Sequence, residues 1–323
     1  MGTAQTVVLA GTPKHLELER PLGLAKRDFL LINISGSCNY SCKKCCNMVP
    51  NKRVMISLEE ITGMVLNAKN ALGIRTVVFI GEGETTLAPN FKSIVSFVHK
   101  AGLNTVIFST GYFIDEPLAR FLAENNVSIV FSLDSLNENR YHGLTGTTNS
   151  FARVMQNIRA CRNIFAEKIR AVNGKRVVFL AINMLLTKDS LDEVEAMKEF
   201  CGNDVLPVFN YPLMVGNALA NKQLFGEVPK KIMQLAAPTN WSEKKEECGY
   251  FFNGITIGLE GSILACPYNL ELTGKLMNIK GMRLEDAVEV HNKIIREFRK
   301  LDAKGYCVMR SPKYSQLLKK LSD

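Results

Sequence analysis

Four cysteines crowd into nine positions near the start of the chain, in the stretch "CNYSCKKCC" at residues 38–46. Three of them, Cys38, Cys42 and Cys45, have the spacing C-x3-C-x2-C. Three thiolates on one loop can hold three irons of a cubane [4Fe–4S] cluster, which leaves the fourth iron without a protein ligand. Such an iron can accept a substrate or a cofactor, so the spacing predicts an iron–sulfur centre with an open position.

Two other kinds of site fit this loop less well. A structural zinc site needs four ligands, and Cys46 is the available fourth thiol. However, the adjacent Cys45 and Cys46 point in different directions on a short loop, so both rarely reach one ion. A thioredoxin-like pair at Cys42 and Cys45 normally opens a helix and needs no third cysteine upstream.

Length, composition and charge limit the class of protein. The chain has 323 residues and is 46% apolar, which is enough to bury a core without disulfides. No apolar run reaches the length of a membrane span, and the start lacks a secretory signal, so we expect a cytoplasmic protein without a membrane partner. The net charge of +9 is dispersed, which suits an acidic protein partner better than nucleic acid.

Apolar, β-branched runs recur along the first two-thirds of the chain, and helical patterns lie between them. The runs predict strands at 29–34, 76–80, 105–109, 127–132, 177–183 and 205–209. The helical patterns lie at 57–72, 90–101, 116–125, 149–168 and 190–201, and the first begins with a capping box of Ser57 and Glu60. Strands that alternate with helices predict an α/β fold, a partial (β/α)6 TIM-like barrel, with its chemistry at the carboxyl ends of the strands.

This pattern stops after about residue 215. The segment "NALANKQLFGEVPKK" is typical of a linker, and "GITIGLEGSILACPY" predicts a hairpin that turns at Glu260 and Gly261. A helix is expected at 284–301. We therefore predict three parts: an N-terminal extension at 1–26, the partial barrel at 27–215, and a linker with a small C-terminal α+β domain at 216–323.

The cysteine loop resembles the cluster loop of the radical S-adenosylmethionine (SAM) superfamily, and this resemblance covers residues 27–215. The stretch "FIGEGETTL" is similar to the Gly-Gly-Glu-like turn after the second strand of that family. The resemblance implies that Gly83 lets the backbone approach and that Glu84 binds the methionyl ammonium of SAM. It places Ser132, in "FSLDS", and Asn183 near the ribose, although polar residues at strand ends also commonly satisfy backbone groups.

One position departs from the family pattern. An aromatic residue usually precedes the third cysteine and lies near the adenine, whereas this chain has Lys44 there. Adenine contacts must then come from elsewhere, for which Tyr40 and the segment "YPLM" are the candidates. Cys46 is either a packing residue or a donor of a hydrogen atom near the radical.

The C-terminal part resembles the SPASM and twitch extensions of the same superfamily, which hold an auxiliary cluster. Cys248, Gly261 and Cys266 have the spacing C-x12-G-x4-C. The resemblance implies an auxiliary [4Fe–4S] cluster on Cys248, Cys266 and Cys307, and no cysteine follows Cys307 to serve as a fourth ligand. The remaining cysteines and two histidines are expected to be structural: Cys161 and Cys201 in the core, His142 and His291 at the surface or at helix caps.

The resemblance implies an enzyme that cleaves SAM reductively at its [4Fe–4S] cluster and uses the 5′-deoxyadenosyl radical to abstract a hydrogen atom. A flavodoxin or ferredoxin-type electron donor is implied. We expect a small hydroxylated metabolite as substrate and dehydrogenation or epimerisation as outcome, the work of an oxidoreductase or an epimerase. Two alternatives stay open: a maturase that modifies a peptide, and a non-catalytic iron–sulfur protein that binds a partner or relays electrons.

Overall fold

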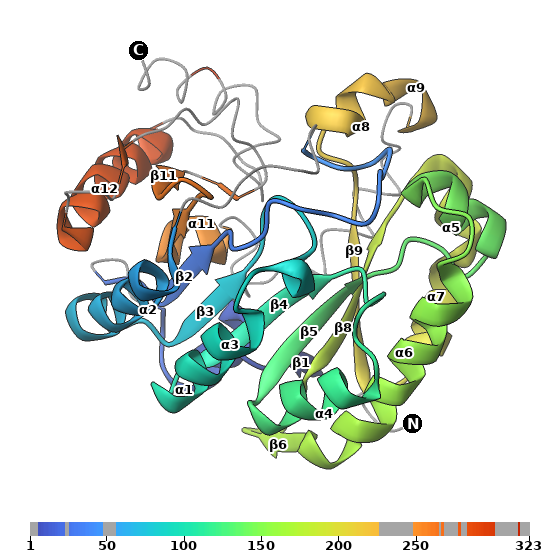
Figure 1. The fold of residues 1–323 in the computed structure, drawn as a ribbon, viewed down its shortest axis with the longest axis horizontal. Coiled ribbons are helices and arrows are strands. Elements are labelled where there is room, and N and C mark those ends of the chain that lie inside the picture. Colours follow the sequence, from blue (N-terminus) through green and yellow to red (C-terminus); the bar gives the residue numbers. More distant parts are fainter. Residues whose placement is uncertain are drawn as a thin grey trace. The chain divides into compact units, whose positions relative to one another are not determined.

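A computed structural model describes residues 6–22, 26–47, 56–225, 248–264, 266–267, 277–278, 283–300 and 316. The chain forms two compact units, each made of three segments. Figure 1 shows the helices and strands, coloured by residue number. The hairpin unit comprises 22–38, 49–103 and 241–323, and the cluster-loop unit comprises 1–21, 39–48 and 104–240. No helix among the described residues is both long and apolar enough to cross a membrane.

The hairpin unit is built on a mixed sheet whose strand order is β12-β11-β10-β2-β3. Its strands are β2 (Phe29–Ile32), β3 (Thr76–Phe79), β10 (Gly254–Ile257), β11 (Ser262–Leu264) and β12 (Met277–Asn278). Strands β10, β2 and β3 run parallel, and every residue of these three strands is buried. Burial on both faces explains why their sequences are apolar without alternation.

Helices accompany this sheet in the described part of the unit. They include α2 (Leu58–Asn67) with a π-helical continuation (Ala68–Leu72), a 3-10 turn (Thr85–Leu87), α3 (Phe91–Lys100), α11 (Gly249–Asn253) and α12 (Leu284–Lys300). The capping box predicted for α2 is present, because Glu60 N donates to Ser57 Oγ at 3.1 Å and Ser57 N donates to Glu60 Oε2 at 2.7 Å. These two bonds fix the start of the helix at the predicted residue.

The predicted hairpin is confirmed, and its position in the sheet is an additional finding. β10 and β11 pair antiparallel with Thr256 opposite Leu264. β10 also pairs in parallel with β2, from Gly254 opposite Phe29 to Ile257 opposite Ile32. The described part of the C-terminal extension therefore continues the sheet of the first predicted strand.

The expectation that His291 lies at the surface or at a cap is wrong. His291 is on the inner face of α12 and only 3% exposed. Its Nδ1 lies 3.4 Å from Nη2 of Arg27, and its ring meets the Phe251 ring edge-on at 5.1 Å. Because Arg27 can only donate, Nδ1 of His291 must be the unprotonated acceptor.

The cluster-loop unit contains a parallel sheet of four strands in the order β4-β5-β8-β9. They are β4 (Asn104–Ser109), β5 (Val127–Ser132), β8 (Leu180–Leu185) and β9 (Val205–Asn210). The helices between them are α4 (Glu116–Glu124), α5 (Glu138–Thr145), α6 (Phe151–Phe165) and α7 (Val194–Cys201). α4 and α6 lie side by side, with α4 against β5 and α6 against β8 (Figure 1).

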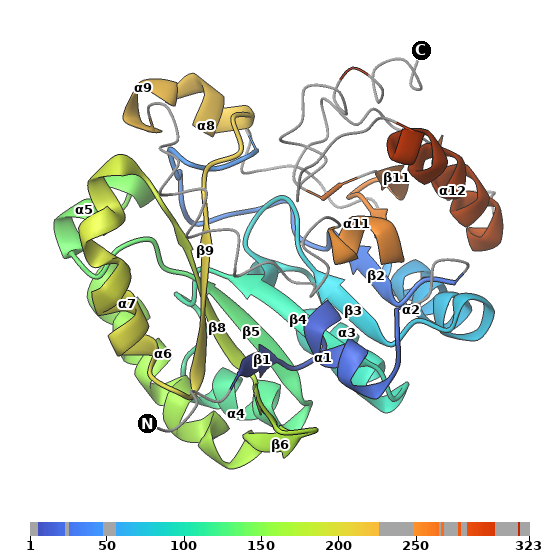
Figure 2. The same cartoon turned by 180° about the vertical axis from the view of Figure 1, so that it is seen from behind.

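The strand predicted at 177–183 is two strands, because the chain changes sheets within it. β7 (Lys175–Val178) belongs to a small sheet with β1 (Val7–Leu9) and β6 (Arg170–Val172). Val178 pairs with Leu9, whereas Leu180 pairs with Ile129 of β5. The N-terminal extension is thus built into this unit, and Figure 2 shows β1 near the amino ends of β5 and β8.

Two further features of this unit bear on the sequence analysis. Cys161 and Cys201 are fully buried, as predicted for core residues, and burial raises the pKa of each thiol to about 12. The segment predicted as a linker contains the short helices α8 (Gly216–Ala220) and α9 (Lys222–Phe225). α8 contacts the cysteine loop, as described below.

Candidate cofactor site

The cysteine loop follows β2. Cys38 is the last residue of the first segment of the hairpin unit, and Cys42 and Cys45 belong to the cluster-loop unit. All three cysteines are half-buried. Cys45 N donates to Cys42 O at 3.2 Å, and Asn47 N donates to Cys45 Sγ at 3.4 Å. Backbone N–H groups that point at sulfur stabilise thiolate ligands of iron, so this turn suits metal-bound sulfur.

Backbone contacts from α5 and α8 hold the loop. Lys43 N donates to the carbonyl oxygen of Leu144 in α5 at 2.9 Å. Ala218 N in α8 donates to Cys45 O at 3.0 Å, and Asn217 Nδ2 donates to Cys42 O at 3.3 Å. The carbonyls of both cysteines are therefore fixed by α8, which the sequence analysis assigned to a linker and did not connect with the site.

Two glycines allow these helices to approach the loop closely. A Cβ atom on Gly216 would lie 2.4 Å from Cys46 O, and one on Gly146 would lie 2.8 Å from Ser41 O. Both glycines have positive φ, 55° and 69°. Only glycine combines this backbone conformation with so short a contact.

A buried ion pair ties the loop to the end of β5. Lys44 pairs with Asp134, and their side chains are 11% and 0% exposed. Asp134 Oδ1 also accepts from the N–H of Leu185, the last residue of β8, at 3.0 Å. Burial lowers the pKa of Lys44, but the charges of Asp134, Cys42 and Cys45 more than offset this effect, so the pKa is raised and Lys44 stays charged.

Tyr40 packs inside the unit. It is 5% exposed, and its hydroxyl lies 3.0 Å from the hydroxyl of Tyr141. Its ring also meets Tyr112 edge-on at 6.3 Å. Burial, followed by the contact with Tyr40, raises the pKa of Tyr141. Tyr40 therefore supports the start of the loop in this structure, and its contact with adenine stays a prediction.

The "GEGE" turn after β3 presses against the segment after β2 within the hairpin unit. A Cβ on Gly83 would lie 2.5 Å from Ser37 O, and Glu84 N donates to the same oxygen at 2.7 Å. A Cβ on Gly81 would lie 2.7 Å from Cγ of Asn33. The backbone at Gly83 thus lies directly against the segment after β2, and this contact joins the ends of β2 and β3.

The Glu84 side chain is only 2% exposed and is held by Thr86. Its Oε1 accepts from Thr86 N at 3.2 Å and from Thr86 Oγ1 at 2.6 Å. These two bonds fix the orientation of the buried carboxylate. Thr86 was missed because a hydroxyl two residues after a glutamate has no distinctive pattern.

Ser132 and Asn183 are register partners at the carboxyl ends of the adjacent parallel strands β5 and β8. Both are half-exposed. Asn183 Oδ1 accepts from Nδ2 of Asn210, the last residue of β9, at 2.6 Å. This bond sets the orientation of the Asn183 amide and leaves its N–H donors for other partners. The predicted pair is therefore adjacent, and Asn210 joins it.

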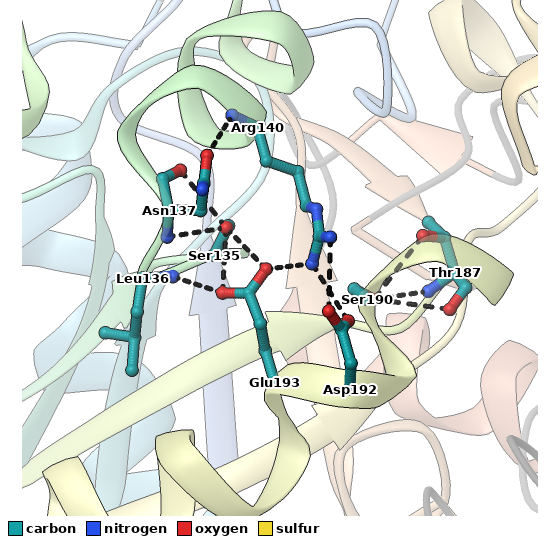
Figure 3. Close-up of polar contacts among 8 residues, drawn as sticks. All are labelled: Ser135, Leu136, Asn137, Arg140, Thr187, Ser190, Asp192 and Glu193. Atoms are coloured by element: carbon teal, nitrogen blue, oxygen red, sulfur yellow. Dashed lines mark hydrogen bonds and ion pairs between the residues drawn. The ribbon is translucent and has the colours of Figure 1, made fainter.

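A second polar network holds the loop after β5 against the turn after β8 (Figure 3). Both carboxylate oxygens of Glu193 lie 2.8 Å from Ser135 Oγ, and the backbone N–H of Leu136 donates to Glu193 Oε2 at 2.6 Å. Arg140 of α5 pairs with Glu193 and, at 3.0 Å, with Asp192. Since α5 also supplies Leu144 to the cysteine loop, this network helps to position the loop.

The predicted auxiliary ligands are only partly described. Cys248 directly precedes α11, and its carbonyl oxygen accepts a hydrogen bond from Phe252 N at 2.9 Å. Cys266 follows β11. Both are half-buried. Cys307 lies outside the described residues. Within the described part of the chain, no three His, Cys, Asp or Glu side chains are gathered to hold a metal ion. Metal binding itself commonly organises such sites.

Cys38, Cys42 and Cys45 belong to the described residues, so their side chains are not gathered around one point for a metal ion either. The types and the spacing of these donors nevertheless fit an iron–sulfur cluster with one open iron. Cys38, Cys42 and Cys45 supply three half-buried thiols on one loop, with backbone N–H and a buried cation beside two of them. The parallel strands end in polar groups. The fold and the site therefore define the class of protein as an α/β protein with a cofactor site at the carboxyl ends of its strands.

Comparisons with known proteins identify the family. The Radical SAM superfamily model matches residues 32–201, just over half of the chain. The chain therefore belongs to the radical SAM superfamily, and its cofactors are SAM and a SAM-binding [4Fe–4S] cluster.

Curated relatives include two enzymes named GTP 3′,8-cyclase. The one from Mannheimia succiniciproducens is 31% identical over 151 residues, which cover 44% of this chain and 43% of the relative. The one from Aeromonas hydrophila is 30% identical over 175 residues, which cover 50% and 48%. The chain thus matches less than half the length of these relatives.

Solved structures confirm the fold class, a partial TIM-like α/β barrel. Streptococcus suis SuiB bound to the precursor peptide SuiA superposes with a TM-score of 0.67 at 16% identity, over 92% of this chain and 74% of SuiB. Native anSMEcpe with bound AdoMet superposes with a TM-score of 0.59 at 17% identity, over 89% and 87%.

Proposed function

We propose that Cys38, Cys42 and Cys45 hold the SAM-binding cluster and that the chain uses it to remove a hydrogen atom from a small hydroxylated metabolite. The observation that carries this proposal is the clamped loop: α5, α8 and Asp134 fix the backbone around Cys42 and Cys45. When bound, the cluster and SAM supply reductive cleavage of the sulfonium and hydrogen-atom abstraction.

The remaining groups of the site have separate tasks. Gly83 gives the turn after β3 its close approach to the segment after β2, and Glu84 presents a carboxylate, oriented by Thr86, for the methionyl ammonium. Ser132 and Asn183 offer a hydroxyl and an amide at neighbouring strand ends, which suits the ribose hydroxyls. Cys46, half-buried with its carbonyl against Gly216, is a candidate hydrogen-atom donor.

The substrate class is inferred from two observations. Asn210, which donates to Asn183, adds a further amide at this edge of the sheet, and amides form directional hydrogen bonds of the kind that hydroxyl-rich ligands use. The curated relatives are named for GTP, which carries ribose hydroxyls. Dehydrogenation and epimerisation both begin with hydrogen-atom removal from a carbon that bears a hydroxyl. A flavodoxin or ferredoxin-type donor suits the basic surface, because such donors are acidic.

The test uses protein reconstituted with iron and sulfide under anaerobic conditions, reduced, and given SAM. Release of 5′-deoxyadenosine and methionine is measured against the Cys38, Cys42, Cys45 triple alanine variant. The expected result is turnover by the wild type and none by the variant. No cleavage by a wild type that carries its full iron would indicate the second alternative, a non-catalytic iron–sulfur protein that binds a partner or relays electrons.

The substrate class is then tested with extracts of cells grown in deuterated medium. A low-mass ultrafiltrate and a peptide fraction are supplied separately, each with and without protease treatment. Deuterium should enter 5′-deoxyadenosine from the protease-resistant ultrafiltrate. Deuterium transfer only from the protease-sensitive fraction would replace the metabolite with a peptide substrate.

A further inference from the structure

The function proposed above uses Lys44 only through the hold that Asp134 has on the loop, and it gives the charge itself no chemical task. Lys44 lies in the chain between Cys42 and Cys45, at the position where the radical SAM pattern has an aromatic residue. Its side chain is 11% exposed, and its ammonium pairs with Asp134, which is completely buried. A charged group so far from water exists only because a partner compensates it.

Structural need alone does not explain this pair. The backbone of the loop is already held by Leu144, Asn217 and Ala218 without any charge. A buried ion pair gains little stability over apolar groups of similar volume, because both charges must be desolvated. An aromatic or aliphatic side chain at position 44 would fill the space at no such cost. The pair therefore points to an electrostatic task at this position.

The cysteines on either side of this charge in the chain are the cluster ligands proposed above. Lys44 lies between Cys42 and Cys45, directly before Cys45, and its ion pair with Asp134 holds the ammonium in place. Asp134 is in turn anchored by the Leu185 N–H at the end of β8, so the ammonium has a fixed location. A cluster becomes more negative when it takes up an electron, and a fixed positive charge in a low dielectric favours that state.

We propose that Lys44, held by Asp134, sets the reduction potential of the SAM-binding cluster by fixing a buried positive charge beside Cys42 and Cys45. Lys44 would thus act on the cluster as a positioned charge, held by Asp134, and not as a ligand. This inference rests on the assignment of these cysteines as ligands. Removing either partner should shift the potential, and the two shifts should have opposite signs.

The test is an anaerobic redox titration of the reconstituted protein, with the reduced cluster followed by electron paramagnetic resonance. Lys44→Met removes the cation and leaves a buried anion, so its potential should fall. At the solution potential that half-reduces the wild type, its ratio of reduced to oxidised cluster should drop by about threefold or more. Asp134→Asn keeps an acceptor for the Leu185 N–H and removes the anion, so its potential should rise.

Two control variants separate charge from structure. Lys44→Arg keeps the charge and should stay near the wild-type potential. Lys43→Met changes the net charge equally at the neighbouring exposed position, so its shift should be much smaller than that of Lys44→Met.

Iron content distinguishes the possible failures. Wild-type potentials in both Lys44→Met and Asp134→Asn at full iron content would overturn the proposal and leave the ligand assignment intact. Loss of the cluster from both variants would show that the pair only holds the loop, which also overturns the proposal. Full iron in the Cys38, Cys42, Cys45 triple variant would instead contradict the ligand assignment itself.

Discussion

Single side chains carry the chemistry of this site. For Glu84, the sequence identifies the residue and the structure shows how its carboxylate is held. The glutamate stood out in the sequence because it follows Gly83 in a turn after a strand. The structure adds that its carboxylate is buried and held by Thr86 through bonds of 2.6 and 3.2 Å. A buried, oriented carboxylate is suited to binding a cation through a charge-assisted hydrogen bond.

We predict that Glu84→Gln weakens SAM binding at least about tenfold, because a charge-assisted bond to the methionyl ammonium contributes on the order of 2–3 kcal/mol. Glutamine keeps an acceptor for Thr86, so the turn and the iron content should be unchanged. Thr86→Val should give a smaller loss, since it disturbs only the orientation. Equilibrium binding to the reconstituted protein measures both. If Glu84→Gln binds SAM as tightly as the wild type, another group holds the ammonium.

His291 leads to a prediction about pH. Burial, and then the charge of Arg27, lower the pKa of His291 to about 3. The unfolded chain protonates this histidine near pH 6.5. Between pH 6.5 and 3 the unfolded state therefore binds the extra proton. The stabilisation is complete above pH 6.5 and is lost as the pH falls, by up to roughly 1 kcal/mol per pH unit.

The measurement is the thermal midpoint between pH 7 and 4. His291→Gln offers Arg27 a carbonyl that does not titrate, so its midpoint should fall less steeply with acid than that of the wild type. His99, half-exposed on α3, provides the matched control, and His99→Gln should keep the wild-type slope. Equal slopes for wild type and His291→Gln would contradict this account.

At the scale of elements, runs of apolar residues were a good guide wherever a strand is buried on both faces. The capping box of α2, the hairpin of β10 and β11 and the helices between the strands followed local rules and were predicted. Three features were not predicted: the pairing of β10 with β2, the change from one sheet to another after Val178, and the contact of α8 with the loop. Each depends on partners far away in sequence, which no local pattern specifies.

Gly216 is the point at which α8 contacts the cysteine loop, so it tests this contact. In Gly216→Ala, a Cβ would lie 2.4 Å from Cys46 O at a residue with φ of 55°. We expect a cost of about 1 kcal/mol or more, and therefore roughly fivefold faster loss of cluster iron to a chelator. Gly102→Ala is the control, because Gly102 also has positive φ, 71°, but no atom lies within 4 Å of its added Cβ. Similar iron loss in both variants would mean that α8 does not secure the loop.

For the whole molecule, the topology limits what an auxiliary cluster could do. Within the hairpin unit, β10 runs parallel to β2 and β11 runs antiparallel to both. The chain therefore leaves β11 toward the amino end of β2 just before Cys266. Tyr250, two residues after Cys248, packs edge-on against Phe29 at the same end, at 5.1 Å. Cys248 and Cys266 thus lie toward the edge opposite to the carboxyl ends of β2 and β3.

This placement favours electron relay or structural support over direct ligation of a substrate at the SAM site. Whether the cluster exists depends on Cys248, Cys266 and Cys307, whose spacing is the basis of the assignment.

We predict that the Cys38, Cys42, Cys45 triple alanine variant loses about four irons per chain and keeps a second cluster of about four. Mössbauer spectroscopy and iron counting after anaerobic reconstitution measure this directly. Adding Cys266→Ala should remove the remaining iron and lower the thermal stability of the chain, because metal binding to a folded site stabilises it. Cys161→Ala, a substitution in the core of the other unit, is the matched addition and should leave the iron unchanged. A triple variant without any iron would show that Cys248 and Cys266 are ordinary half-buried thiols, and that the C-terminal hairpin extends the sheet without holding a cluster.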